Sequence, residues 1–114
     1  MTLLRLYPVV FLIVLTVYTL IVIANHGMGL VPIFFNDMAA MAWPGQFNLD
    51  FMGFLILSAL WVGWRHEYSL IGWVLTPLAL TGGGLFLTIY LLIMSFRVNG
   101  DLKALLIGER RAAA

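Results

Sequence analysis

Hydrophobic residues run along this chain in long blocks, and polar residues gather in short groups between them. Three blocks are nearly free of charge, at about residues 6–24, 47–64 and 69–96. A helix that rises ~1.5 Å per residue needs ~20 apolar residues to cross ~30 Å of hydrocarbon. We therefore predict an all-α integral membrane protein, a three-helix transmembrane bundle that forms a single domain over residues 1–111.

A fourth apolar segment, at about residues 28–43, is interrupted by Pro32, Asn36 and Asp37. It is short for a crossing, and a charge near the centre of a span is costly. We predict that it is an interfacial or re-entrant segment between the first two spans. A fourth span stays open as an alternative, because it would put Arg5 on the same side as the basic tail.

The third block is longer than a bilayer requires, since 28 residues extend about 42 Å as a straight helix. Pro77 removes one backbone hydrogen bond, and Gly82-Gly83-Gly84 follows at the middle of the block. These residues predict a bend in the third span. Residues 97–111 alternate leucine and isoleucine with charged residues, which predicts an amphipathic tail on the membrane surface.

Composition and charge narrow the class of protein further. Hydrophobic residues make up 63% of the chain and charged residues 10%, whereas soluble domains average ~45–50% and ~25%. The six scattered cations and the net charge of +1 provide no basic patch for nucleic acid, so no nucleic-acid partner is expected. The absence of cysteine excludes disulfides and thiolate metal sites, and we predict no metal site.

Basic residues also indicate an orientation. In a three-span protein the tail carries four cations on one side, while Arg5 and Arg65 lie on the other. Because cytoplasmic segments are enriched in Lys and Arg, the tail is predicted to face the cytoplasm and the turn at residues 65–68 to face away.

Polar residues are expected to converge at one membrane face of such a bundle. Asp50, His26 and Arg97 are the candidate catalytic residues, with Asp50 about one turn inside its helix as an acid, base or proton relay. The alternative is structural, with Asp50 and His26 capping helix ends and Arg97 anchored at the headgroups. The full predicted group is Asn25, His26, Asn36, Asp37, Gln46, Asn48, Asp50, Arg97 and Asp101.

Small residues form a stripe along the third block, where spacings of four, three and four place them on one helix face. These residues are Gly72, Thr76, Ala79 and Gly83. Such stripes permit close helix packing, and Ala59 and Gly63 of the second span are the expected counterpart. Alternatively, Gly82, Gly83 and Gly84 line a groove for an apolar pigment, a quinone or a lipid, although no cofactor is predicted outright.

Several short stretches resemble those of short three-span bacterial inner-membrane proteins known only as domains of unknown function. The resemblance implies a multi-pass protein of the bacterial inner (cytoplasmic) membrane and carries over no catalytic residue. The stretches are Leu30-Val31-Pro32-Ile33-Phe34-Phe35, Phe47-Asn48-Leu49-Asp50-Phe51, Leu57-Ser58-Ala59-Leu60-Trp61 and Thr76-Pro77-Leu78.

These patterns favour a non-enzymatic function. Three spans leave little room for a catalytic cavity, and small-residue stripes serve helix contacts. We expect an accessory or structural subunit that contacts membrane lipids and packs against a larger membrane complex or its own copies. The alternative is an enzyme or carrier for an apolar isoprenoid or lipid, with the Asp50, His26 and Arg97 group as its interfacial site.

Overall fold

The computed structural model describes residues 2–114, which are helical except for short turns. Three of the helices, α1, α3 and α4, are long and apolar enough to cross a membrane, as predicted. The helices are α1 (Thr2–His26), α2 (Leu30–Ala40), α3 (Trp43–Arg65), α4 (Leu70–Arg97), α5 (Leu102–Ile107) and α6 (Glu109–Ala113).

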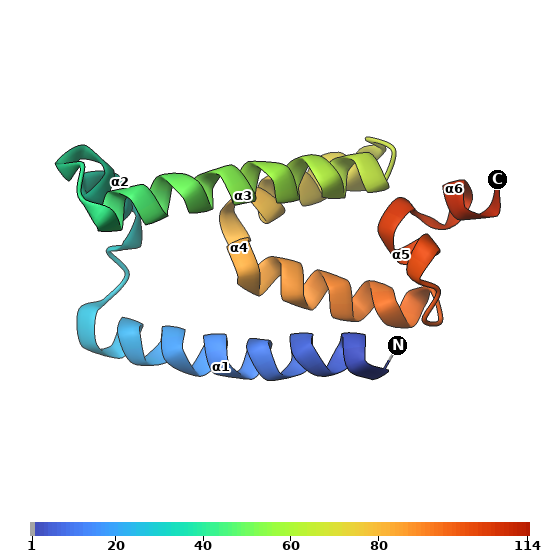
Figure 1. Ribbon diagram of the computed structural model, residues 1–114, viewed down its shortest axis with the longest axis horizontal. Helices are drawn as coiled ribbons and strands as arrows, with labels where there is room; N and C mark the ends of the chain where they lie inside the picture. The colour runs from blue at the N-terminus through green and yellow to red at the C-terminus, as the bar shows by residue number, and fades with distance from the viewer. Residues whose placement is uncertain (1) are drawn as a thin grey trace.

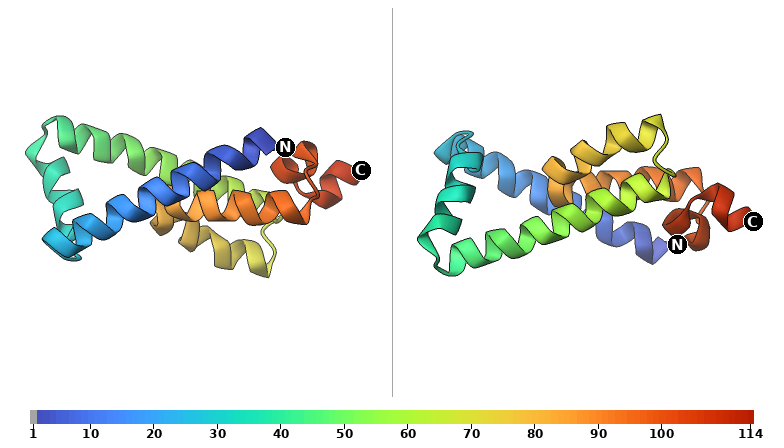
Figure 2. Two further views of the ribbon diagram at one scale, coloured as in Figure 1. Left: turned by 90° about the horizontal axis from the view of Figure 1, so that it is seen from below. Right: turned by 90° about the horizontal axis from the view of Figure 1, so that it is seen from above.

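Helices α1 and α3 extend along the long dimension of the molecule, which measures 49 Å, and α2 lies across one end between them (Figures 1 and 2). Helix α2 ends at Met41, which has a left-handed φ of 55°. Pro44 then occupies the first turn of α3, where its missing N–H costs no hydrogen bond. The segment at residues 28–43 is therefore a short helix of 11 residues rather than a full-length one.

Helix α4 reverses direction at Gly83, whose φ of 57° and ψ of −140° are not helical. Glycine adopts such a conformation without the steric cost that a Cβ would add. Its first half runs along α3 toward the middle of the molecule, and its second half returns to the end from which it came (Figures 1 and 2). The predicted bend is present, and it is a reversal set by Gly83 rather than a kink at Pro77.

Contacts along α4 follow this reversal. A Cβ on Gly72 would lie 3.2 Å from the carbonyl oxygen of Gly63, near the end of α3, and one on Gly83 would lie 3.1 Å from the ring of Phe51. Tyr90 is back beside Arg65. The prediction that the third block carries the chain to the opposite end is therefore wrong, because a glycine with positive φ turns it back at half depth.

This topology divides the protein into two ends. We call the end with the start of α1, the α3–α4 turn and α5–α6 the cationic end, because all six Lys and Arg residues lie there, namely Arg5, Arg65, Arg97, Lys103, Arg110 and Arg111. The opposite end, with the end of α1, α2 and the start of α3, we call the open end.

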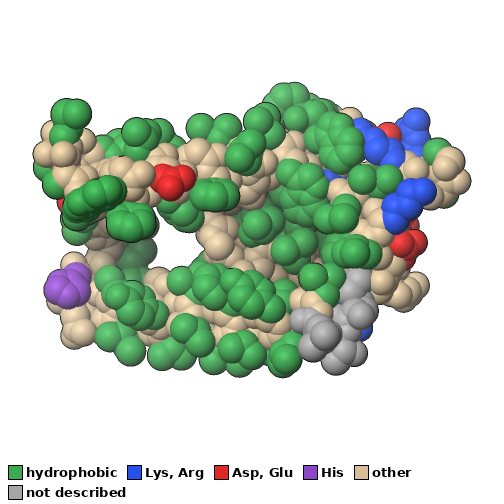
Figure 3. Space-filling view, in the orientation of Figure 1, with side chains coloured by type: hydrophobic (Ala, Val, Ile, Leu, Met, Phe, Trp, Pro, Cys, Tyr) green, Lys and Arg blue, Asp and Glu red, His purple; other side chains and the backbone are tan. Residues whose placement is uncertain are grey.

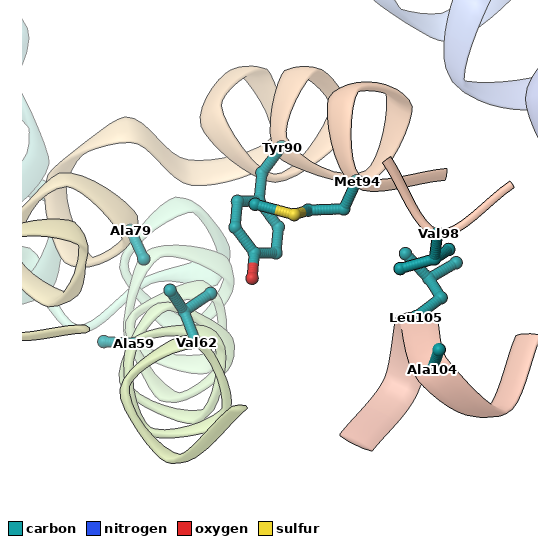
Figure 4. Close-up of a cluster of buried hydrophobic side chains, with 8 residues drawn as sticks. All are labelled: Ala59, Val62, Ala79, Tyr90, Met94, Val98, Ala104 and Leu105. Atoms are coloured by element: carbon teal, nitrogen blue, oxygen red, sulfur yellow. The ribbon is translucent and has the colours of Figure 1, made fainter. Parts of the chain in front are cut away.

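The buried core lies in the cationic half and includes no residue of α1 or α2 among those described. Tyr90 and Met94 of the returning half of α4 lie between Val62 of α3 and the α5 pair (Figure 4). Toward the open end, α1 and α3 separate, and the space-filling view shows an opening between them (Figure 3). The core residues are Ala59, Val62, Ala79, Tyr90, Met94, Val98, Ala104 and Leu105.

Candidate functional site: the cationic end

The three candidate catalytic residues are not brought together. His26 ends α1 and Asp50 lies in the first half of α3, both toward the open end, whereas Arg97 ends α4 at the cationic end. Asp101 follows Arg97 and caps the N-terminus of α5, accepting hydrogen bonds from the backbone N–H groups of Lys103 and Ala104. The predicted convergence of Arg97 and Asp101 with the other polar residues is wrong, because it assumed that α4, although bent, carries the chain to the opposite end.

At the open end, a smaller polar cluster joins α2 to α3. The Asn48 side-chain amide donates to the Phe34 carbonyl oxygen at 3.1 Å and to the Asp37 carboxylate at 3.5 Å. Asp50 is exposed on α3, and within residues 2–114 it has no hydrogen-bond or ion-pair partner. It therefore does not form an acid–base pair within this chain.

His26 lies at the rim of an apolar cavity between the second half of α1 and the start of α2. The cavity has a volume of about 510 Å³ and is lined by aliphatic and aromatic side chains, Tyr18, Val22 and Ile33 among them. Its size is within the ~300–1,000 Å³ range of small-molecule sites. An apolar chain fits this chemistry better than a charged ligand.

The small-residue stripe is at a close helix contact, as predicted. A Cβ on Gly63 would lie 2.8 Å from the Thr76 hydroxyl oxygen, and Ala59 and Ala79 are buried. The first half of α4 thus packs along α3 through Gly72, Thr76 and Ala79.

The glycine run sits where α4 contacts both long helices. A Cβ on Gly83 would be 3.1 Å from Phe51 and 3.6 Å from Leu55 of α3, and one on Gly84 would be 3.5 Å from Phe11 of α1. Side chains of α1 and α3 thus lie against the non-helical backbone at Gly83, which is half-buried. The alternative of a ligand groove along Gly82, Gly83 and Gly84 stays a prediction.

Arg65 organises the cationic end from a buried position, with 6% of its surface exposed. Its guanidinium donates to the carbonyl oxygens of Leu105 (2.6 Å) and Ala104 (3.1 Å) in α5 and to the Tyr90 hydroxyl (3.3 Å) in α4. The Trp61 indole N–H donates to the next carbonyl, that of Leu106, at 3.0 Å. The carbonyl oxygens of Leu105 and Leu106, near the end of α5, are thereby satisfied by α3, while that of Ala104 also accepts from the Gly108 backbone N–H at 2.9 Å.

His66 follows α3 and lies 2.7 Å from the Tyr90 hydroxyl, through its Nε2 atom. Burial, and then the nearby charges of Arg65 and Arg97, hold the pKa of His66 below its ordinary value of 6.5. The imidazole is therefore neutral at pH 7, and its Nε2 atom can accept a hydrogen bond from the Tyr90 hydroxyl while the Tyr90 oxygen accepts one from Arg65.

The tail also contacts the end of α3 and the α3–α4 turn, through Arg111 and Arg110. The Arg111 guanidinium donates to the Trp64 carbonyl oxygen at 2.6 Å and stacks 4.0 Å from the centre of the Trp64 ring. Arg110 forms an exposed ion pair with Glu67 at 3.4 Å. Helices α5 and α6 are thus docked on the protein rather than lying free on a surface.

Between the α3–α4 turn and the tail is a cleft of about 310 Å³. We call it the arginine cleft, because Arg65, Arg97, Arg110 and Arg111 line it. Two carboxylates, Glu67 and Glu109, share its rim, so positive charge predominates. The other lining residues are His66, Ile71, Met94, Ile107 and Gly108.

No group of three or more His, Asp or Glu side chains suited to a metal ion occurs within residues 2–114. The sequence did not single out Arg65, Tyr90 or the arginine cleft, because their approach depends on the reversal at Gly83. One signal was present. If the third block returns to the end from which it starts, all six Lys and Arg residues lie on one side instead of being divided four to two.

Comparison of the chain with protein families, curated proteins and solved structures finds no match. The resemblance to short three-span bacterial membrane proteins therefore stays a prediction. The site is defined by its geometry alone, as an arginine cleft at one end and an unpaired Asp50 with an apolar cavity toward the other.

Proposed function

We propose that this chain is a small accessory subunit of the bacterial inner membrane, which assembles with a helix of another chain through the Asp50 face of α3. Asp50 carries the proposal. It lies seven residues inside α3, or about 10 Å along the helix axis, and it is exposed.

A charged side chain at that depth is costly unless it meets a polar partner. The cost is ~2.5–3.5 kcal/mol for an aspartate at the centre of a span. Lys and Arg reach the headgroups along flexible stems, but the short aspartate side chain does not. Since Arg97 lies at the opposite end, a partner helix with a hydrogen-bond donor is the simplest source of compensation.

The open end supports the same proposal. Helix α1 is almost unburied, with 6% of its apolar window inside the protein, and the returning α4 leaves the interval between α1 and α3 unfilled toward the open end (Figure 3). A helix from a partner chain placed against this half would gain the dispersion contacts that drive association in lipid.

The cationic end is proposed to face the cytoplasm. All six Lys and Arg residues lie there, which follows the positive-inside rule more closely than a four-to-two division. In this arrangement α1 and α3 cross the membrane, α4 enters and leaves from the cytoplasmic side, and the open end faces away.

The mass of the complex in mild detergent tests the assembly. The wild-type chain is expected to carry a stoichiometric partner or second copy, and Asp50→Leu is expected to lose it because the buried donor of the partner would be left unpaired. Asp37→Leu is the matched control, because Asp37 already has Asn48 as a partner within the chain. Retention of the complex by Asp50→Leu would refute the proposed interface.

A second function is favoured by the apolar cavity of about 510 Å³ beside His26. The chain would then bind an apolar isoprenoid, quinone, pigment or lipid tail as a carrier or enzyme. Filling the cavity by Val22→Trp should remove such a ligand from the intact-mass spectrum while leaving any protein partner bound. The outward-facing Val17→Trp serves as the control for added bulk on α1.

A further inference from the structure

The arginine cleft has more positive charge than its own carboxylates neutralise. Four arginines line it against Glu67 and Glu109. Only one ion pair joins these groups among the described residues, that of Arg110 with Glu67, and Arg110 is 85% exposed. The cleft therefore retains a net capacity for an anion.

The arginines of the cleft differ in how many of their N–H groups already donate hydrogen bonds. Arg65 donates three hydrogen bonds, two to carbonyl oxygens of α5 and one to the Tyr90 hydroxyl. Arg111 is held on the carbonyl oxygen and ring of Trp64. Arg97 is exposed and makes no hydrogen bond or ion pair within residues 4–114, whose side chains the structure describes. Arg97 and the weakly paired Arg110 are thus the available donors.

The surroundings of the cleft combine charge with apolar surface. Ile71 and Met94 of α4 line it beside the arginines. Trp64, Tyr68 and Trp73 lie at the same end of α3 and α4, and aromatic side chains of this kind concentrate at the headgroup level of a bilayer. A soluble anion would gain nothing from contact with the apolar wall, whereas the glycerol and first methylene groups of a lipid would pack against it.

We propose that the arginine cleft binds the phosphate of an anionic phospholipid headgroup, with Arg97 and Arg110 as its donors and Ile71 and Met94 against its glycerol region. Guanidinium groups match phosphate geometry with paired N–H donors. Basic pockets between membrane helices on the cytoplasmic side bind anionic headgroups in this way. The site is separate from the Asp50 face and does not depend on the proposed assembly.

Native mass spectrometry of the full chain released from nanodiscs tests this binding. The nanodiscs contain equal amounts of phosphatidylglycerol and phosphatidylcholine. The wild-type chain is expected to retain phosphatidylglycerol preferentially. Arg97→Gln should lower that preference about five-fold, which corresponds to the ~1 kcal/mol that one basic residue contributes at an anionic surface. Arg110→Gln should act in the same direction, and Arg97→Lys, which keeps the charge but loses the paired donors, should fall between the wild-type chain and Arg97→Gln.

Lys103→Gln is the matched control, because Lys103 is an exposed cation of the same end that does not line the cleft. Equal retention of the two lipids by the wild-type chain would overturn the proposal. So would an equal loss for Lys103→Gln and Arg97→Gln, which indicates only general attraction to the surface. Displacement of phosphatidylglycerol by millimolar inorganic phosphate would overturn the lipid as the source and assign the cleft to a soluble phosphate.

Discussion

At the cationic end, α3, α4 and the tail share hydrogen bonds and buried side chains, whereas at the open end α1 and α3 separate and α2 lies across the gap between their ends. Arg65 alone joins three helices, while Asp50 has no partner within residues 2–114. The comparison teaches that this fold is specified from one end. The other end has few buried side chains of its own, and the proposed assembly would supply the missing contacts.

Labelling of single cysteines gives the largest expected difference, because it is nearly all-or-none. Ser69→Cys in the α3–α4 turn and Lys103→Cys in the tail should react with an impermeant thiol reagent from the same side of the membrane. Met28→Cys, at the open end, should react only from the other side. Labelling of Ser69→Cys and Lys103→Cys from opposite sides would mean that α4 crosses the membrane, and the two-ended description would fail.

Replacement of Gly83 by leucine should have the next largest effect. The backbone at φ 57° and ψ −140° costs a residue with a Cβ about 1–3 kcal/mol, and the added side chain would also displace Phe51. The expected outcome is a clear fall in thermal stability in detergent. Leu80→Phe is the control on the same helix, since Leu80 is partly exposed. Equal melting temperatures for the two variants would show that the reversal is not a constraint.

Replacement of Arg65 by glutamine should release the tail from the cationic end. The variant loses charge-assisted hydrogen bonds worth roughly 1.5–3 kcal/mol each in gross terms. Allowing for new contacts with water, we expect a loss of about 2 kcal/mol, or about thirty-fold faster amide hydrogen exchange in α5. Lys103→Gln, on the exposed side of α5, should leave that exchange unchanged. The docking description would be wrong if both variants exchange at the wild-type rate.

A smaller effect is expected from pH. The pKa of His66 is lowered in the docked state by burial, Arg65 and Arg97, so the undocked state binds a proton at higher pH. Docking is therefore fully stable above pH 6.5 and weakens as the pH falls through 6.5 toward the lowered value. Hydrogen exchange in α5 should rise between pH 7.5 and 5.5 after correction for its intrinsic pH dependence. His66→Gln should remove this rise, whereas His26→Gln, at the open end, should keep it.

The apolar blocks predicted where the long helices lie, because the length and apolar composition of such helices leave a strong signal in the sequence. The small-residue stripe of Gly72, Thr76 and Ala79 was predictable from spacing, since its residues repeat on one helix face. The direction of the chain after Gly83 was not. A run of three glycines is compatible with a kink or a full reversal, and only the contacts of Gly83 with Phe51 and of Tyr90 with Arg65 decide between them.

The wrong direction predicted for the chain after Gly83 also made the predicted site wrong. A third span that crosses to the opposite end places Arg97 and Asp101 beside Asp50 and His26, and leaves Arg65 with Arg5 at the far side. Arg65 also carries no periodic signal, because its partners are backbone carbonyl oxygens of residues 104 and 105, which any sequence supplies. Such contacts with the backbone are invisible in side-chain patterns.

In the proposed arrangement, the reversal of α4 has a consequence for how the protein would enter the membrane. A helix that crosses must carry a polar segment through the hydrocarbon, whereas the α4 hairpin has Gly82, Gly83 and Gly84 at its tip. The segment to be translocated would be that between α1 and α3, residues 27–42, which contains no Lys or Arg and only Asp37 as a charge. Insertion of the second half of the chain would then require no further translocation, and α4 would enter from the side on which it is synthesised after α1 and α3 have crossed.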